Sequence, residues 1–66
     1  MTELPIAAVD RIIRKAGVAR VSEDAAIELA EILEEKAMEV ANDAGKLSEY
    51  AGRKTVRDGD IRMAAK

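Results

Sequence analysis

The sequence has no cysteine and no histidine, and these two absences exclude several kinds of site. The chain cannot form a disulfide framework, a zinc site with Cys or His ligands, or a catalytic centre that uses a thiol or an imidazole. Tyr50 is the single aromatic residue, which disfavours binding of single-stranded nucleic acid through stacked bases. No apolar run reaches the roughly 18 residues of a membrane-spanning helix, and the N-terminus lacks the basic and apolar regions of a signal peptide. We therefore expect a cytoplasmic protein without a membrane partner, metal or cofactor.

Length and composition predict one small folded domain, residues 1–66. The 66 residues suffice for a single domain, and 48% of them are apolar, which excludes simple disorder. The net charge of −2 by itself argues against a nucleic-acid partner. The charges are segregated, however: residues 1–21 carry four cations and two anions, residues 22–52 two cations and nine anions, and residues 53–66 five cations and two anions. A phosphate backbone responds to a local basic patch, so DNA binding depends on whether the fold brings the two basic ends to one surface.

A short helix is predicted between Pro5 and Gly17. Proline suits the first helical position, and glycine suits a left-handed stop. Apolar residues recur between them at steps of three and four, as a helix with one buried face requires: Ile6, Val9, Ile12, Ile13 and Ala16. The stretch 18–21 that follows is short and β-branched at its ends, and we expect an extended loop.

A long helix is predicted from Ser22 to Ala51. Ser22 suits the N-cap of this helix. The reciprocal bond of a capping box is absent, because Ala25 stands three residues later where a Glu or Gln would be needed. The apolar stripe then continues without a helix-ending residue until Gly52, through Ala26, Leu29, Ala30, Leu33, Ala37, Val40, Ala41, Ala44, Leu47 and Ala51. Residues 53–56 are again short and extended, and a last short helix is predicted for 58–66. The predicted fold class is therefore all-α.

The length of the second helix predicts an obligate dimer. Thirty residues span about 45 Å, whereas a compact monomer of 66 residues is only about 30 Å across. Two short helices cannot cover so long an apolar stripe, so we expect the same helix of a second copy to cover it. Gly45 lies inside this helix, where small size allows a close approach; a kink at Gly45 is the less favoured alternative.

The order of the helices and several short motifs resemble the archaeal histone family, the minimal histone fold without tails. The resemblance covers the whole chain. It rests on Glu3-Leu4-Pro5-Ile6-Ala7, Arg11-Ile12-Ile13, Ala16-Gly17, Arg20-Val21-Ser22, Leu33-Glu34-Glu35, Ala51-Gly52-Arg53-Lys54-Thr55 and Asp60-Ile61. It implies a handshake homodimer, in which the two long helices cross and the first loop of each protomer lies beside the second loop of the other.

The resemblance also implies which residues bind double-stranded DNA: Arg11, Arg14, Arg20, Arg53, Lys54, Thr55 and Arg57. Arg20 corresponds to the residue that enters the minor groove, where the guanidinium meets a strong negative potential. Thr55 of the partner chain would donate to phosphate or orient Arg20, and Lys54 would contribute positive charge. Arg53 also has an implied structural role, an ion pair with Asp60. The alternative for each of these side chains is that it is an ordinary solvated surface residue with no role in DNA binding.

Further positions match those through which dimers of the family join into tetramers and longer polymers, namely Leu47, Tyr50, Asp60 and Met63. The family commonly has histidine where Tyr50 stands, so pH sensitivity through that contact would be lost. Simple surface packing, or packing within the dimer, is the alternative reading of these positions. The chain also departs from its relatives in its short last helix and in Lys36, Glu49 and Gly59, which predicts weaker and more salt-sensitive DNA binding than a basic relative shows.

The predicted function is that of an archaeal histone. It would bind duplex DNA largely without base specificity, wrap and compact it as dimers, and associate with the chromosome in the nucleoid. The alternative is a histone-fold variant or transcription-complex subunit that acts mainly by pairing with other histones and binds DNA weakly. An enzyme is not expected, because the carboxylates of the long helix follow the spacing of a solvated helix face: Glu28, Glu31, Glu35 and Glu39.

Overall fold

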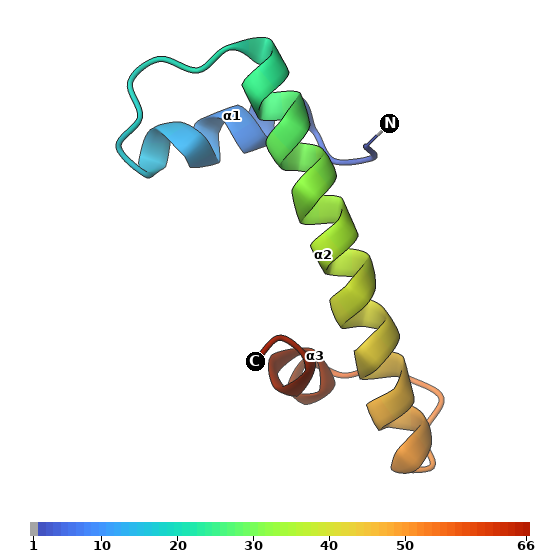
Figure 1. The fold of residues 1–66 in the computed structure, drawn as a ribbon. Coiled ribbons are helices and arrows are strands. Elements are labelled where there is room, and N and C mark those ends of the chain that lie inside the picture. The colour runs from blue at the N-terminus through green and yellow to red at the C-terminus, as the bar shows by residue number, and fades with distance from the viewer. Residues whose placement is uncertain (1) are drawn as a thin grey trace. The chain divides into compact units, whose positions relative to one another are not determined.

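The structure, a computed structural model, describes residues 2–66 and consists of three helices joined by two loops (Figure 1). Helix α1 spans Ile6–Lys15, α2 spans Glu23–Tyr50 and α3 spans Asp58–Ala64. None of the described residues forms a strand, which confirms the predicted all-α class. The chain divides into two compact units, one ending at Glu35 and the other running from Lys36 to Lys66, and each is described separately.

The first helix begins one residue later than predicted. Pro5 is its N-cap, with φ −65° and ψ 118°, rather than its first helical residue. The fixed φ of proline suits both positions, but the extended ψ places Pro5 outside the helix. At the other end, Gly17 has a φ of 102°, so the predicted left-handed stop is confirmed.

Helix α2 is a single continuous element of 28 residues, two fewer than predicted. Its N-cap is Ser22, as expected, because the backbone N–H of Ala25 donates to Ser22 Oγ at 3.1 Å. The helix continues through Gly45 without a break and ends at Tyr50, shortly before Gly52 with its φ of 72°. The last helix, α3, ends at Ala64, two residues short of the predicted end.

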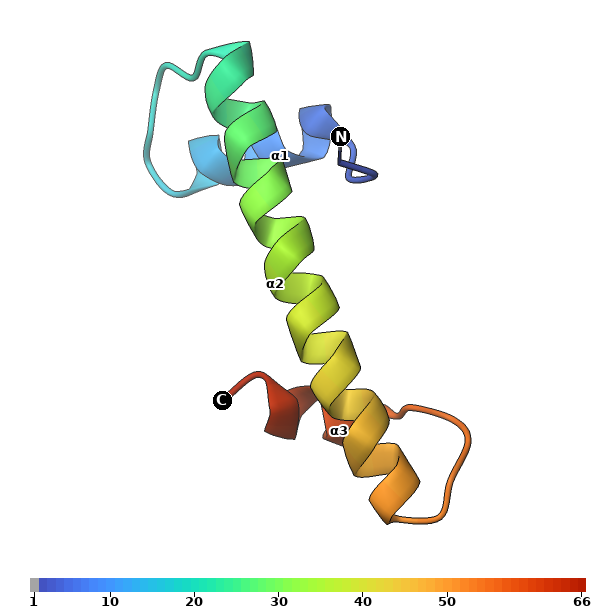
Figure 2. The same ribbon diagram turned by 45° about the vertical axis from the view of Figure 1, so that its right-hand side comes forward.

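The first unit has a small core between α1 and the N-terminal part of α2, which lie across one another in both views (Figures 1 and 2). Val9 of α1 meets Ala26 and Ala30 of α2, and all three are at most 3% exposed. Alanine at these two positions lets the helices approach closely. Larger apolar residues from the surrounding chain pack around this centre: Leu4, Ile6, Ile13, Val21 and Leu29.

The second unit has a core that is partly polar. Ala44 and Ser48, one turn apart on α2, are 0% and 2% exposed, and Asp60 of α3 is 8% exposed. Hydrogen bonds of Ser48 join the second loop to α2, and hydrogen bonds of Asp60 join α3 to the same loop.

Much of the predicted apolar stripe remains open to water in a single chain. Of its members, Leu33 is 37% exposed, and Ala37 and Ala41 are also exposed. Ile32 and Met38, which lie on α2 outside the predicted stripe, are 51% and 63% exposed, and no large side chain among residues 2–66 is fully buried. An open apolar surface on α2 is the condition from which the obligate dimer was predicted. Within the described residues, no helix combines the length and the apolar character needed to cross a membrane.

Candidate nucleic-acid interface

The first loop, residues 16–22, carries Arg20, and hydrogen bonds with residues at the end of α1 determine the path of its first part. Gly17 N–H donates to the carbonyl oxygen of Arg14 at 3.0 Å, and its positive φ turns the chain away from the helix axis. Arg14 Nη1 then donates to the carbonyl oxygen of Ala19 at 3.0 Å. At the far end, the half-buried side chain of Val21 packs against the core of the first unit. Arg20 itself is exposed between these two attachments.

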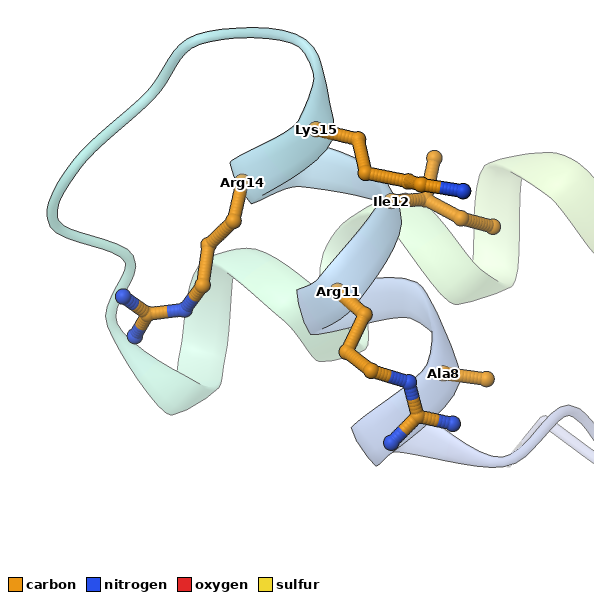
Figure 3. A pocket seen from close by; sticks show the side chains of 5 residues that line it. All are labelled: Ala8, Arg11, Ile12, Arg14 and Lys15. Atoms are coloured by element: carbon orange, nitrogen blue, oxygen red, sulfur yellow. The ribbon is translucent and has the colours of Figure 1, made fainter.

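Three cations of α1 line a shallow hollow whose floor is apolar (Figure 3). Its lining consists of Ala8, Arg11, Ile12, Arg14 and Lys15, and Ile12 is 55% exposed. The three cations differ in their partners. Arg14 pairs with Asp10, with Nε 2.9 Å from Oδ2, whereas Arg11 and Lys15 make no ion pair with any residue from 2 to 66. Arg11 and Lys15 are thus the cations of this helix that are free for a phosphate.

The segment before α1 is held by Glu34 of α2. Glu34 Oε1 accepts a hydrogen bond of 2.7 Å from the backbone N–H of Glu3, and Leu4 N–H donates to Thr2 Oγ1 at 3.1 Å. These bonds fix the chain at the N-terminus of α1, which is the end of the helix that favours an anion. Sequence reasoning did not assign this role to Glu34, because the path of the N-terminal segment cannot be read from periodicity.

The second loop, residues 51–57, begins with a glycine-terminated helix end. Gly52 N–H donates to the carbonyl oxygen of Glu49 at 2.9 Å, and Arg53 N–H donates to that of Ser48 at 3.0 Å. This pair of bonds is the Schellman motif, which satisfies the last carbonyls of a helix and needs a residue with positive φ, here Gly52. The motif sets the direction in which the chain leaves α2.

Ser48 holds the rest of this loop, and its role was not predicted. Its buried hydroxyl lies 3.1 Å from the carbonyl oxygens of both Arg53 and Thr55 and donates to them. The signal in the sequence was a lone polar residue on the apolar stripe, one turn after Ala44. The bond fixes the backbone on both sides of Lys54 and leaves the Lys54 side chain exposed.

Arg53 and Asp60 form a two-pronged ion pair in the structure. Arg53 Nη1 and Nη2 donate to Asp60 Oδ2 and Oδ1, both at 2.9 Å, and Arg53 Nη1 also donates to the carbonyl oxygen of Thr55 at 3.0 Å. Asp60 Oδ2 accepts a further bond of 2.9 Å from the backbone N–H of Arg57, the N-cap of α3. The hydrogen bonds from Arg53 and from the Arg57 backbone lower the pKa of Asp60 to about 2 and, in turn, the pair raises the pKa of Arg53.

The predicted DNA ligands therefore fall into two groups, according to whether their side chains already have partners within the chain. The exposed residues without such a partner among residues 2–66 are Arg11, Arg20, Lys54, Thr55 and Arg57, and Arg14 is exposed but has partners. Arg53 is occupied by Asp60 and has a side chain that is only 26% exposed, and Arg14 is occupied by Asp10 and the Ala19 carbonyl. The first unit contains Arg11 and Arg20, and the second contains Lys54 and Arg57. The approach of Arg20 to the second loop of another chain stays a prediction.

The four positions matched to dimer–dimer contacts differ in accessibility. Tyr50 is 91% exposed and Met63 66%, and Leu47 is half-buried. Asp60 is 8% exposed, and both of its oxygens already accept hydrogen bonds within the chain. Any part that Asp60 plays in contacts between dimers must therefore be compatible with its pairing to Arg53.

Comparison with known proteins gives a consistent result over the whole chain. Residues 2–65 match the family described as histone-like transcription factor (CBF/NF-Y) and archaeal histone. The chain is 61% identical over 66 residues to one of the subunits of the archaeal histone HAN1 from Thermococcus zilligii, and the match covers all of this chain and 98% of that protein. It is 48% identical over 64 residues to probable archaeal histone 3 of Methanocaldococcus jannaschii, covering 97% and 96% of the two chains. With its short, long and short helices in this order, the chain belongs to the histone-like transcription factor and archaeal histone family and has the histone fold.

Proposed function

We propose that this DNA-binding histone acts as a handshake dimer that wraps and compacts double-stranded DNA in the chromosome. The observation that carries the proposal is the pair of preformed loops, each fixed by bonds of its own unit and each presenting exposed cations: Arg20 in the first, Lys54 and Arg57 in the second. In a handshake dimer the first loop of one chain lies beside the second loop of its partner. Each such pair would then form one basic patch.

The open apolar surface of α2 supports the dimer. Leu33 and Met38 are exposed in the single chain, and covering them requires another protein surface. A second copy offers the same surface, as a two-fold interface requires. Tetramers and longer polymers on DNA would use the exposed side chains of Tyr50 and Met63 at the end of α2 and in α3.

The mechanism of binding is electrostatic and depends on the DNA backbone. Lysine and arginine side chains displace counterions condensed on the phosphates, and Arg20 enters the minor groove where it faces the protein. The single aromatic residue and the small number of exposed polar side chains on the loops leave little for base recognition. Preference among DNA sequences would therefore follow the ease with which they bend.

The second candidate function is that of a histone-fold subunit whose main partners are other histones. The acidic segment favours it: residues 22–52 carry nine acidic and two basic side chains, and the net charge of the chain is −2. Long-range repulsion between this segment and DNA would weaken binding. Such a protein would still form a dimer, and its DNA affinity would be low even at low salt.

Titration of the full chain with random-sequence duplex DNA at several salt concentrations separates the two functions. The test variant is Arg20→Ala/Lys54→Ala, and the matched control is Arg62→Ala/Lys66→Ala, which removes two cations at the C-terminal end outside both loops. For the packaging histone, affinity falls steeply with salt, and the test variant has lower affinity and a slope shallower by about 0.9 for each phosphate that it no longer neutralises. The control keeps most of the affinity. A folded wild-type dimer that shows no binding at low salt would instead support the interaction subunit.

A further inference from the structure

Arg14 joins helix α1 to the first loop through two different acceptors. Its Nε donates to Asp10 Oδ2 at 2.9 Å, one helical turn back, and its Nη1 donates to the carbonyl oxygen of Ala19 at 3.0 Å. Figure 3 shows the Arg14 side chain extended toward the loop, while Arg11 and Lys15 point in other directions. We call this arrangement of Asp10, Arg14 and the Ala19 carbonyl the loop clasp.

Within a single chain, the loop clasp is the main restraint on the residues around Arg20. No backbone hydrogen bond of the described chain holds residues 18–21, and Val18 is 46% exposed. The loop is attached at Gly17, through its bond to Arg14, and at Val21, which packs on the core. Between these two points, the bond from Arg14 to the Ala19 carbonyl is the contact that fixes the backbone next to Arg20.

We propose that Arg14 acts on DNA binding as a positioning residue for Arg20, and that Asp10 holds Arg14 in the orientation this requires. The inference rests on the proposed binding of duplex DNA and replaces the predicted role of Arg14 as a phosphate ligand. The planar guanidinium suits this task, because its donors face a carboxylate and a carbonyl at the same time, which a lysine ammonium on a flexible stem does not reproduce. With the loop held, Arg20 loses less conformational freedom when it enters the groove.

The two roles of Arg14 predict opposite effects of removing Asp10. If Arg14 were a phosphate ligand, Asp10 would compete with DNA for it, and Asp10→Ala would raise DNA affinity. If the loop clasp positions Arg20, Asp10→Ala releases Arg14 and lowers affinity. Alanine is also the better helix former inside α1, so a loss of affinity cannot be ascribed to a weaker helix.

The binding experiment compares Asp10→Ala with Asp58→Ala in the full chain, using random-sequence duplex DNA at one salt concentration. Asp58 is a matched control because it pairs with Arg62 at 3.0 Å with the same i,i+4 spacing, but its arginine contacts no loop carbonyl. Asp58 is more exposed than Asp10, 82% against 32% for the side chains. We expect Asp10→Ala to bind DNA about threefold to fivefold more weakly than Asp58→Ala. We expect Arg14→Lys to bind DNA more weakly than wild type by a similar factor, although it keeps the positive charge. When Asp10→Ala and Asp58→Ala are each introduced into a chain that already carries Arg20→Ala, the ratio of their DNA affinities is expected to be about one. Equal or tighter binding by Asp10→Ala, or a ratio that persists without Arg20, would overturn the proposal.

A measurement without DNA keeps this inference separate from the proposed function. Backbone order parameters of Val18, Ala19 and Arg20 are measured by ¹⁵N relaxation for the wild-type chain and for Arg14→Gln and Asp10→Ala. We expect lower order parameters at these three residues in both variants, with the values in α2 unchanged. If wild type does not bind DNA but the loop loses order in the variants, the proposed function fails and the loop clasp stands. Unchanged order would refute the loop clasp whatever the DNA result.

Discussion

Replacing Ser48 by alanine tests how the second loop is held in place. The hydroxyl donates to the carbonyl oxygens of Arg53 and Thr55 at 3.1 Å, so the change removes one donor shared by two acceptors. Arg53 is only half-buried and Thr55 is exposed, so water can replace part of what is lost, and the cost is about 1 kcal/mol. Alanine recovers part of this through its higher helix propensity. The expected net loss is about 0.5–1 kcal/mol, or about 3–6 °C in Tm for a chain of this size.

The assay for Ser48→Ala compares stability with DNA affinity. Ser22→Ala is the matched control, since it removes the N-cap bond to Ala25 at a cost of about 1 kcal/mol without touching the second loop. Thermal unfolding of all variants is followed at the same protein concentration, because the stability of a dimer depends on protein concentration. At a temperature where the variants are folded, Ser48→Ala is expected to bind DNA severalfold more weakly than wild type. Ser22→Ala serves only as the control for stability, because Ser22 lies in the first loop. Equal DNA affinity of Ser48→Ala and wild type would show that the second loop keeps its shape without the hydroxyl, and the reasoning would be wrong.

Three further changes have defined outcomes. The pKa of Asp60 is lowered from 3.8 to about 2, so its pairing stabilises the fold above pH 4, and this contribution is lost as the pH falls through about 2. In urea unfolding, the difference in stability between wild type and Asp60→Asn is expected to be constant above about pH 5 and to narrow below pH 4. A difference that widens on acidification would contradict the assignment. Gly52→Ala is expected to lower stability by about 1 kcal/mol in the same assay because its φ of 72° is unfavourable for alanine, and no loss would mean that the helix end rearranges easily. Gly45→Ala is expected to raise stability by up to about 1 kcal/mol because a Cβ there meets nothing within 4 Å in the chain, whereas a loss would indicate that a partner chain comes close to this glycine.

The helices could be predicted from the sequence because their signals are local. The apolar period, the N-cap Ser22 and the glycines at 17 and 52 lie within a few residues of the ends they determine, and the structure places those ends within two residues of the prediction. Pro5 was assigned one position too far into the helix, since proline fixes φ and leaves ψ to the surrounding chain.

The internal bonds of the loops could not be predicted in the same way. The contact of Arg14 with the Ala19 carbonyl depends on the path of an irregular backbone, and the exposure of a single cation cannot be read from its place in the sequence. The ion pair of Arg53 with Asp60 was named from a family resemblance and not from spacing. Ser48 was overlooked because a serine in a helix has many uses, and only the folded loop shows which carbonyls lie within reach of its hydroxyl.

The bonds that shape the second loop also bear on the order of events during folding. They join residues no more than seven positions apart, from the Schellman bonds at the end of α2 to the pair of Arg53 and Asp60. Contacts of such short sequence separation close small chain loops and form quickly. The slow step in reaching the native dimer should then be the encounter of two chains, so the refolding rate is expected to rise with protein concentration. In a newly made chain, the bonds of the second loop could therefore form before the chain meets a partner.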